Sequence, residues 1–334
     1  MVSKTAVSKT VDQEVREMPK DEQAYLRLVE RLSKASVEKH WEPYIDIEWD
    51  DPEMKIDTSD ARWELPAIDS FGSHPWYRSQ PAEVRAGIGL YRFANAAKIG
   101  VQFENLLNRG LYNYASGLPN GSAEFRYAYH EAIEEGHHGM MFQELVNRTG
   151  FDIPGMPPVL KQISPAVVPL ARFFPELFFF FVLGGEDPID YVQRRMLSED
   201  ENIHPLAERI MRIHVAEEAR HLSFARSYLR RRVPKIGFWR KRILRVAIPM
   251  ILGQMSRTML APSRAMIRHF NIPREVVEEA YINNPRSRAE IKASLVKVRD
   301  LAAELGLIDV FTKQIWKAYR IWDEPTKAAA KAAA

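Results

Sequence analysis

The strongest constraint on this chain is an order of acidic residues and histidines that occurs twice. Glu104, set among apolar residues in IGVQFENLL, is followed by the Glu-x-x-His pair of Glu135 and His138. The same order recurs further along the chain, with almost the same internal spacing. The second copy consists of Glu186, Glu218 and His221. This duplication predicts two helix–turn–helix units that face each other.

Residues three or four apart share one face of a helix, so each Glu-x-x-His pair points both side chains the same way. His214 lies one turn before Glu218 and joins its stripe. In some four-helix bundles, two helices give one glutamate each and the other two give Glu-x-x-His pairs to a dimetal site. Four carboxylates can neutralise and bridge two cations that lie about 3.5–4 Å apart. We therefore predict an all-α fold, a four-helix bundle with a pair of metal ions in its core.

A second Glu-x-x-His frame, Glu134 with His137, overlaps the first one. The face of Glu135 and His138 carries apolar neighbours such as Phe142, whereas the face of Glu134 carries more charged residues. We therefore place Glu135 and His138 in the core. Further residues are predicted to support the ligands from outside, without binding metal themselves. These are Glu131, His137 and Glu217.

The composition restricts the alternatives. The chain has no cysteine, which excludes disulfides, thiolate metal sites, iron–sulfur clusters and a cysteine nucleophile. Imidazole and carboxylate ligands suit iron, manganese or zinc. A net charge of +3 and the lack of a recognition motif argue against nucleic-acid binding. The absence of cysteine also fits a cytoplasmic protein. No signal peptide and no apolar run of spanning length is visible in the sequence.

Changes in composition divide the chain into four parts. A polar, disordered tail is expected over residues 1–20, followed by a helix and an extended, wrapping arm rich in Trp and Pro over 21–80. Helical periodicity over 81–325 predicts the metal-binding domain, with additional helices flanking the bundle. Residues 326–334 form a low-complexity Ala/Lys tail.

The motifs FENLL, EEGHH, LGGED and especially HVAEEARH resemble those of the AurF-like diiron arylamine oxygenases, the p-aminobenzoate N-oxygenase family. This family has a third histidine one turn before the final Glu-x-x-His, where His214 stands here. The resemblance extends over roughly residues 85–230 and implies a ferritin-like bundle, a homodimer and two iron ions. The implied ligands are Glu104, Glu135, His138, Glu186, His214, Glu218 and His221.

The resemblance implies an O2-dependent monooxygenase for a small organic substrate, with N-oxygenation of an aryl amine as the family's reaction. Hydroxylation or desaturation of a lipid-like or carrier-bound substrate stays open, as do a Mn/Fe centre and a ferroxidase or metal-handling role without an organic substrate. An apolar cavity that reaches the metals would favour an oxygenase, whereas an acidic entry path would favour a ferroxidase. The aromatic run at 173–181 is a candidate wall for such a cavity.

Electrons for O2 chemistry are expected from outside the chain, because the sequence has no dinucleotide-binding fingerprint. A separate reductase is the expected partner. The basic segment 230–245, which includes Phe238 and Trp239, is a candidate docking site for an acidic reductase, an anionic carrier protein or a membrane surface. A solvated basic surface explains this segment equally well.

Overall fold

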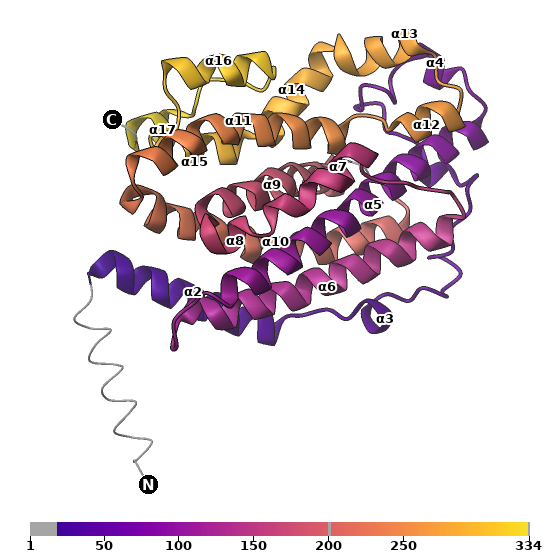
Figure 1. The fold of residues 1–334 in the computed structure, drawn as a ribbon. Coiled ribbons are helices and arrows are strands. Elements are labelled where there is room, and N and C mark those ends of the chain that lie inside the picture. The colour runs from indigo at the N-terminus through magenta and orange to yellow at the C-terminus, as the bar shows by residue number, and fades with distance from the viewer. Residues whose placement is uncertain (1–18, 200–201, 333–334) are drawn as a thin grey trace.

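The structure is a computed structural model that describes residues 19–199 and 202–332 (Figure 1). Its regular elements within these ranges are all helical, with no β-strand. Residues 1–18, which make up most of the expected 1–20 tail, lie outside the described residues, as do 333–334 at the other end. The all-α fold predicted from the sequence is confirmed.

Four long helices form the centre of the molecule. Helix α5 (Ala82–Ala115) packs along α6 (Ala123–Thr149), and α9 (Pro175–Glu199) packs along α10 (Pro205–Arg232). Contacts of α10 with α6 and of α9 with α5 close the bundle. Proline suits the first position of α10, since that backbone nitrogen needs no acceptor there. Gly150 caps the C-terminal end of α6, and its φ of 70° lies in the left-handed region that favours glycine.

One glycine sets how closely α5 and α9 approach. A Cβ atom at Gly185 would clash with the ring of Phe103 on α5. Since glycine has no side chain, the ring lies directly against the α9 backbone. The next residue on each helix is a predicted ligand, Glu186 on α9 and Glu104 on α5. The close crossing therefore brings these two carboxylates into one site.

An N-terminal helix and an irregular arm wrap the bundle (Figure 1). Their elements are α2 (Lys20–Glu38), α3 (Pro43–Asp46), η1 (Ala61–Trp63) and α4 (Pro75–Arg78). Helix α2 packs against α6 and α10. Further along the arm, Arg148 of α6 donates to the carbonyl oxygen of Trp49 (2.7 Å), and Arg92 of α5 pairs with Asp69 (2.7 Å). These contacts hold the arm along the helices.

Shorter helices complete the fold. The connecting elements are α7 (Pro158–Ile163), η2 (Ser164–Val167), α8 (Leu170–Phe173) and η3 (Val233–Lys235). The C-terminal elements are α11 (Phe238–Leu260), α12 (Arg264–His269), α13 (Arg274–Val277), η4 (Glu278–Ile282), α14 (Pro285–Ser294), α15 (Val296–Glu304), α16 (Val310–Ala318) and α17 (Lys327–Ala332). Helix α11 lies against α9 and α16, so the C-terminal third covers one side of the bundle.

The most apolar segment of α9 is part of the hydrophobic core. Phe178, Phe179 and Phe180 are almost fully buried, and Phe179 packs against Phe224 and Tyr228 of α10. In the part of the chain that the structure describes, no helix has the length and apolar content needed to cross a membrane.

The basic segment 230–245 is largely occupied by internal ion pairs. Its pairs are Arg230 with Glu304 (2.7 Å), Arg231 with Glu124 (2.7 Å), Arg240 with Glu176 (3.2 Å) and Arg245 with Asp309 (3.5 Å). Lys235 and Arg242 remain exposed. Beside them, Phe238 and Trp239 are 65% and 74% exposed. The outward-facing part of the segment is thus an aromatic pair flanked by two cations.

Candidate metal centre

The seven predicted ligands meet in the middle of the bundle, from four different helices. Helix α5 contributes Glu104, α6 contributes Glu135 and His138, and α9 contributes Glu186. Helix α10 contributes His214, Glu218 and His221. None of the seven is more than 2% exposed. Along α6, Ala132 belongs to one apolar cluster and Met141 to another, so the polar site lies between two hydrophobic cores.

The donor atoms lie close enough to share ions. Three overlapping groups, whose ligand atoms lie within 4.8 Å of one another, contain all seven residues. The groups are Glu104 with His138 and His214, Glu135 with Glu218 and His221, and Glu186 with His214 and Glu218. Because members are shared between groups, the arrangement suits two adjacent cations.

Glu135 occupies a central position between two histidines. Its Oε2 lies 2.9 Å from Nδ1 of His138, and its Oε1 lies 3.0 Å from Nδ1 of His221. Glu218 mirrors it from α10, with Oε1 at 3.1 Å from Nδ1 of His221 and 3.5 Å from Nδ1 of His138. Each of these carboxylates therefore lies between the two Glu-x-x-His pairs.

Burial, together with the charged groups at the centre, shifts the pKa of every predicted ligand. Burial, together with the neighbouring carboxylates, raises the pKa of Glu104 and of Glu186 well above the usual range. Burial alone would lower the pKa of His138, but hydrogen bonds with Glu135 and Glu217 outweigh it and raise the pKa to about 10. A donor set of this kind binds metal ions in exchange for its protons.

Two further glutamates, one on α6 and one on α10, each hydrogen-bond a histidine of the other helix on the side of the ring that faces away from the centre. Glu217 accepts a hydrogen bond from Nε2 of His138 (2.8 Å), and Glu134 accepts one from Nε2 of His221 (2.7 Å). With Nε2 engaged, Nδ1 of each ring is the nitrogen that faces the predicted centre. Glu217 was predicted from the sequence as a supporting residue. Glu134 was missed, because its other neighbours on the helix face are polar.

Arg220 links these two supporting glutamates. Its Nη2 lies 2.8 Å from Oε1 of Glu134 and 3.4 Å from Oε1 of Glu217. Arg220 is only 8% exposed, so its charge is balanced mainly by these two carboxylates. The histidine supports of the two Glu-x-x-His pairs are therefore joined through one guanidinium group.

The third histidine, His214, is hydrogen-bonded to its supporting residue through Nδ1 rather than through Nε2. Nδ1 of His214 lies 2.8 Å from Oε1 of Gln193 on α9. Since an amide oxygen only accepts, Nδ1 carries the proton and Nε2 presents its lone pair. Nε2 lies 3.8 Å from Glu218 and 3.9 Å from Glu104. Gln193 had no signal in the sequence, because its role depends on how α9 packs against α10.

The other two residues predicted as supports lie near the centre without bonding to a predicted ligand. Glu131 is fully buried, one turn before Glu135, and neither of its oxygens has a hydrogen-bond partner within the described structure. Burial raises its pKa to about 8. His137 is half-buried and lines a small surface hollow together with Glu217 and Trp41.

Unpaired oxygens at the centre test whether the site suits metal ions. Oε2 of Glu104 and Oε2 of Glu218 are buried, and neither has a hydrogen-bond partner among the described residues. A buried carboxylate oxygen without a partner is costly, so such atoms are rare in folded proteins. Cations between these carboxylates would satisfy both oxygens. The donor set, which combines carboxylates with imidazoles, therefore fits divalent metal ions.

A cavity of about 230 Å³ extends from the predicted centre toward the surface. Glu104, Glu186 and His214 form part of its wall, and because all three are buried they mark its deep end. Its middle is lined mainly by apolar side chains, among them Phe93, Ala97, Met196, Ile210 and Met211. None of residues 173–181 lines the cavity, so the expectation that this aromatic run forms its wall is wrong.

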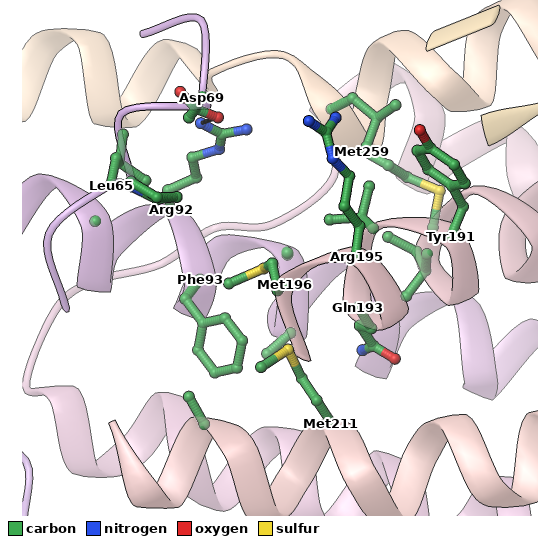
Figure 2. Close-up of a pocket in the computed structure, with 18 of the residues that line it drawn as sticks. Leu65, Asp69, Arg92, Phe93, Tyr191, Gln193, Arg195, Met196, Met211 and Met259 are labelled. Carbon is green, nitrogen blue, oxygen red and sulfur yellow. Dashed lines mark hydrogen bonds and ion pairs between the residues drawn. The ribbon is translucent and has the colours of Figure 1, made fainter. Parts of the chain in front are cut away.

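Charged residues line the outer end of the cavity. Figure 2 shows Arg92 and Arg195 extending toward one end, while Phe93, Met196 and Met211 lie further from that end. The outer end is built from the arm, α5, α9 and α14, whereas the metal-site residues come from the bundle alone. The arm therefore completes the cavity wall.

Comparisons with known proteins agree with this site. The family model described as "P-aminobenzoate N-oxygenase AurF" matches residues 22–306. The chain belongs to this family. Uncharacterised proteins of Mycobacterium tuberculosis and Mycobacterium bovis are 42% identical to it over 307 residues, which cover 92% of this chain and 90% of theirs. No solved structure matches this chain. The AurF family is one of oxygenases, and the buried carboxylate and histidine groups described above suit the metal ions such an enzyme uses.

Proposed function

We propose that the protein is an O2-dependent diiron monooxygenase that oxygenates a small organic substrate held in the cavity. The observation that carries this proposal is the position of the cavity, whose apolar wall runs directly to Glu104, Glu186 and His214. A ferroxidase would instead need acidic groups along the whole path of incoming iron, whereas the carboxylates at the outer end of this cavity are separated from the predicted centre by an apolar stretch of wall. The family's name points to N-oxygenation of an aryl amine as the reaction.

The seven buried donors would hold two iron ions, which supply the reduction of O2. Glu104, Glu135, Glu186 and Glu218 would help to hold the ions and would neutralise their charge. The histidines would complete coordination, with the imidazoles oriented by Glu217, Glu134 and Gln193. The apolar middle of the cavity excludes water from the reacting atoms and places the substrate against the centre.

Electrons would come from a separate protein. The exposed Phe238 and Trp239, flanked by Lys235 and Arg242, are the proposed contact for an acidic reductase. Charge complementarity of this kind raises the rate at which two proteins meet. The internally paired arginines of the same segment stabilise the fold instead.

The test is iron loading followed by exposure to O2. The protein is loaded anaerobically with Fe(II), and bound iron is measured by mass spectrometry; we expect two ions per chain. O2 uptake is then measured with and without a panel of aryl amines, and products are analysed after incubation in isotopically labelled O2. Oxygen incorporation into an amine supports the proposal. O2 consumption that scales only with added Fe(II), with no labelled product, would establish the ferroxidase alternative instead.

A matched pair of variants makes the test specific. Glu104→Ala removes a buried carboxylate of the predicted centre, and we expect it to abolish stoichiometric iron binding. Glu144→Gln changes an acid of α6 that pairs with Arg148 near the surface, 2.7 Å away. This control should bind iron as the unaltered protein does.

A further inference from the structure

Each arginine along the cavity wall already has an acidic partner within the protein. Arg62 pairs with Asp60 (2.6 Å), Arg92 pairs with Asp69 (2.7 Å), and Arg195 pairs with both Glu199 and Glu290 (2.8 Å each). No lysine belongs to the described cavity wall. The cavity thus presents no uncompensated cation to a ligand.

At the outer end, acids outnumber bases. Arg92 and Arg195 face three carboxylates, those of Asp69, Glu199 and Glu290. Glu290 is held near Asp69, and burial together with the Asp69 charge raises its pKa. A ligand carboxylate placed here would add a further negative charge in a partly buried setting. Such a charge would be desolvated without gaining an unpaired cation.

The size and wall chemistry of the cavity point to an apolar ligand larger than one ring. A buried apolar cavity of about 150 Å³ is enough to hold benzene, whereas this cavity measures about 230 Å³. Met196, Met211 and Met259 line it, and the flexible thioether side chains of methionine adapt to ligands of varied shape.

We propose that the cavity takes an uncharged, mainly apolar molecule of about two fused aromatic rings, and that it discriminates against a carboxylate at the outer end. This deepens the proposed function and rests on it for the reaction at the deep end of the cavity. The substrate class differs from p-aminobenzoate, the compound in the family's name, which has one ring and a carboxylate.

The test compares ligands that differ only in charge. Calorimetric titration of the full chain, with and without bound Zn2+, measures the dissociation constants of 6-amino-2-naphthamide and 6-amino-2-naphthoate. We expect the amide to bind about tenfold more tightly or better, corresponding to the cost of an uncompensated, partly buried charge. The amide should also bind more tightly than its one-ring analogue, p-aminobenzamide. Naphthoate or p-aminobenzoate binding as tightly as the naphthamide would overturn the proposal.

Variants at the outer end check the cause. Asp69→Asn keeps the Oδ1 acceptor that holds the backbone N–H groups of Phe71 and Gly72, but it removes the charge facing Arg92. This change should tighten naphthoate binding several-fold and leave naphthamide binding nearly unchanged. Glu290→Gln should act in the same direction through Arg195 and does not depend on the arm. An unchanged preference in both variants would refute the charge argument.

A surface control and the metal experiment separate the possible failures. Glu304→Gln removes an equivalent charge next to Arg230, away from the cavity, and should alter neither dissociation constant. Ligand binding is measured without turnover, so it can be judged separately from iron binding. A protein that binds the amide selectively but takes up no iron would support the proposed ligand class and contradict the proposed function. A protein that binds iron but neither naphthalene ligand would contradict the proposed substrate class and leave the proposed function standing.

Discussion

Glu134 and Glu217 each hydrogen-bond a histidine of the opposite helix, so each should affect the affinity for one metal ion more than the affinity for the other. Glu217 supports His138 from α10, and Glu134 supports His221 from α6. Replacing a carboxylate that hydrogen-bonds a ligating histidine typically lowers metal affinity about 10- to 100-fold, or about 1.4–2.8 kcal/mol. Both glutamates are at most 2% exposed, so solvent screening does not reduce this effect.

The structure also ranks the two substitutions. Glutamine keeps an acceptor for the imidazole N–H but carries no charge. Arg220 lies 2.8 Å from Glu134 and 3.4 Å from Glu217. Glu134→Gln therefore removes the closer partner of a buried guanidinium and should cost more metal affinity than Glu217→Gln, with values near the upper end of that range.

Anaerobic Co(II) titration followed by optical spectroscopy resolves the two ions. We expect Glu217→Gln to weaken the ion beside His138 and Glu134→Gln to weaken the ion beside His221, while the second ion in each variant changes little. Glu144→Gln on α6 again provides the control. Equal weakening of both ions in both variants, or wild-type affinity throughout, would show that the crossed hydrogen bonds do not position the histidines.

Three other predictions concern different parts of the molecule. Gln193→Leu removes the acceptor that orients the third histidine; we expect altered optical spectra of the cobalt protein and slower turnover, whereas unchanged spectra would contradict this. Gly185→Ala should lower the free energy of unfolding by about 1–3 kcal/mol, because the added methyl group would meet the ring of Phe103. Gly139→Ala should raise it by about 0.5–1 kcal/mol, because the added methyl group would meet no other atom. Urea unfolding measures both changes. Trp239→Ala combined with Arg242→Glu should slow turnover with a reductase and leave peroxide-driven turnover intact; an equal loss in both assays would reject docking at this surface.

The sequence predicted the bundle and the candidate ligands because both depend on periodicity within single helices. Spacing of three and four residues places Glu135 and His138 on one face whatever surrounds them. Burial then follows from the apolar neighbours on that face. The role of these residues as metal ligands stays a prediction, which the titrations above would test.

Features that depend on contacts between helices were harder to predict. Glu134 looked solvent-exposed from its own helix, although the paired acids Glu134–Glu135 and Glu217–Glu218 occur at equivalent places in both copies. That repetition was an available signal. No equivalent signal existed for Gln193. The aromatic run of α9 was misread because periodicity identifies a buried face without telling whether it borders a cavity or a packed core.

The arm has a consequence for how the protein is made. Trp63 and Leu65 of the arm form part of the cavity wall. The arm is anchored to residues that come much later in the chain. His74 contacts Glu279, 205 positions downstream, and Arg286 donates to the carbonyl oxygen of Ile68. A growing chain emerges N-terminus first. The ribosome therefore delivers this part of the wall long before the helices that fasten it, and the cavity wall is complete only after α14 has been made.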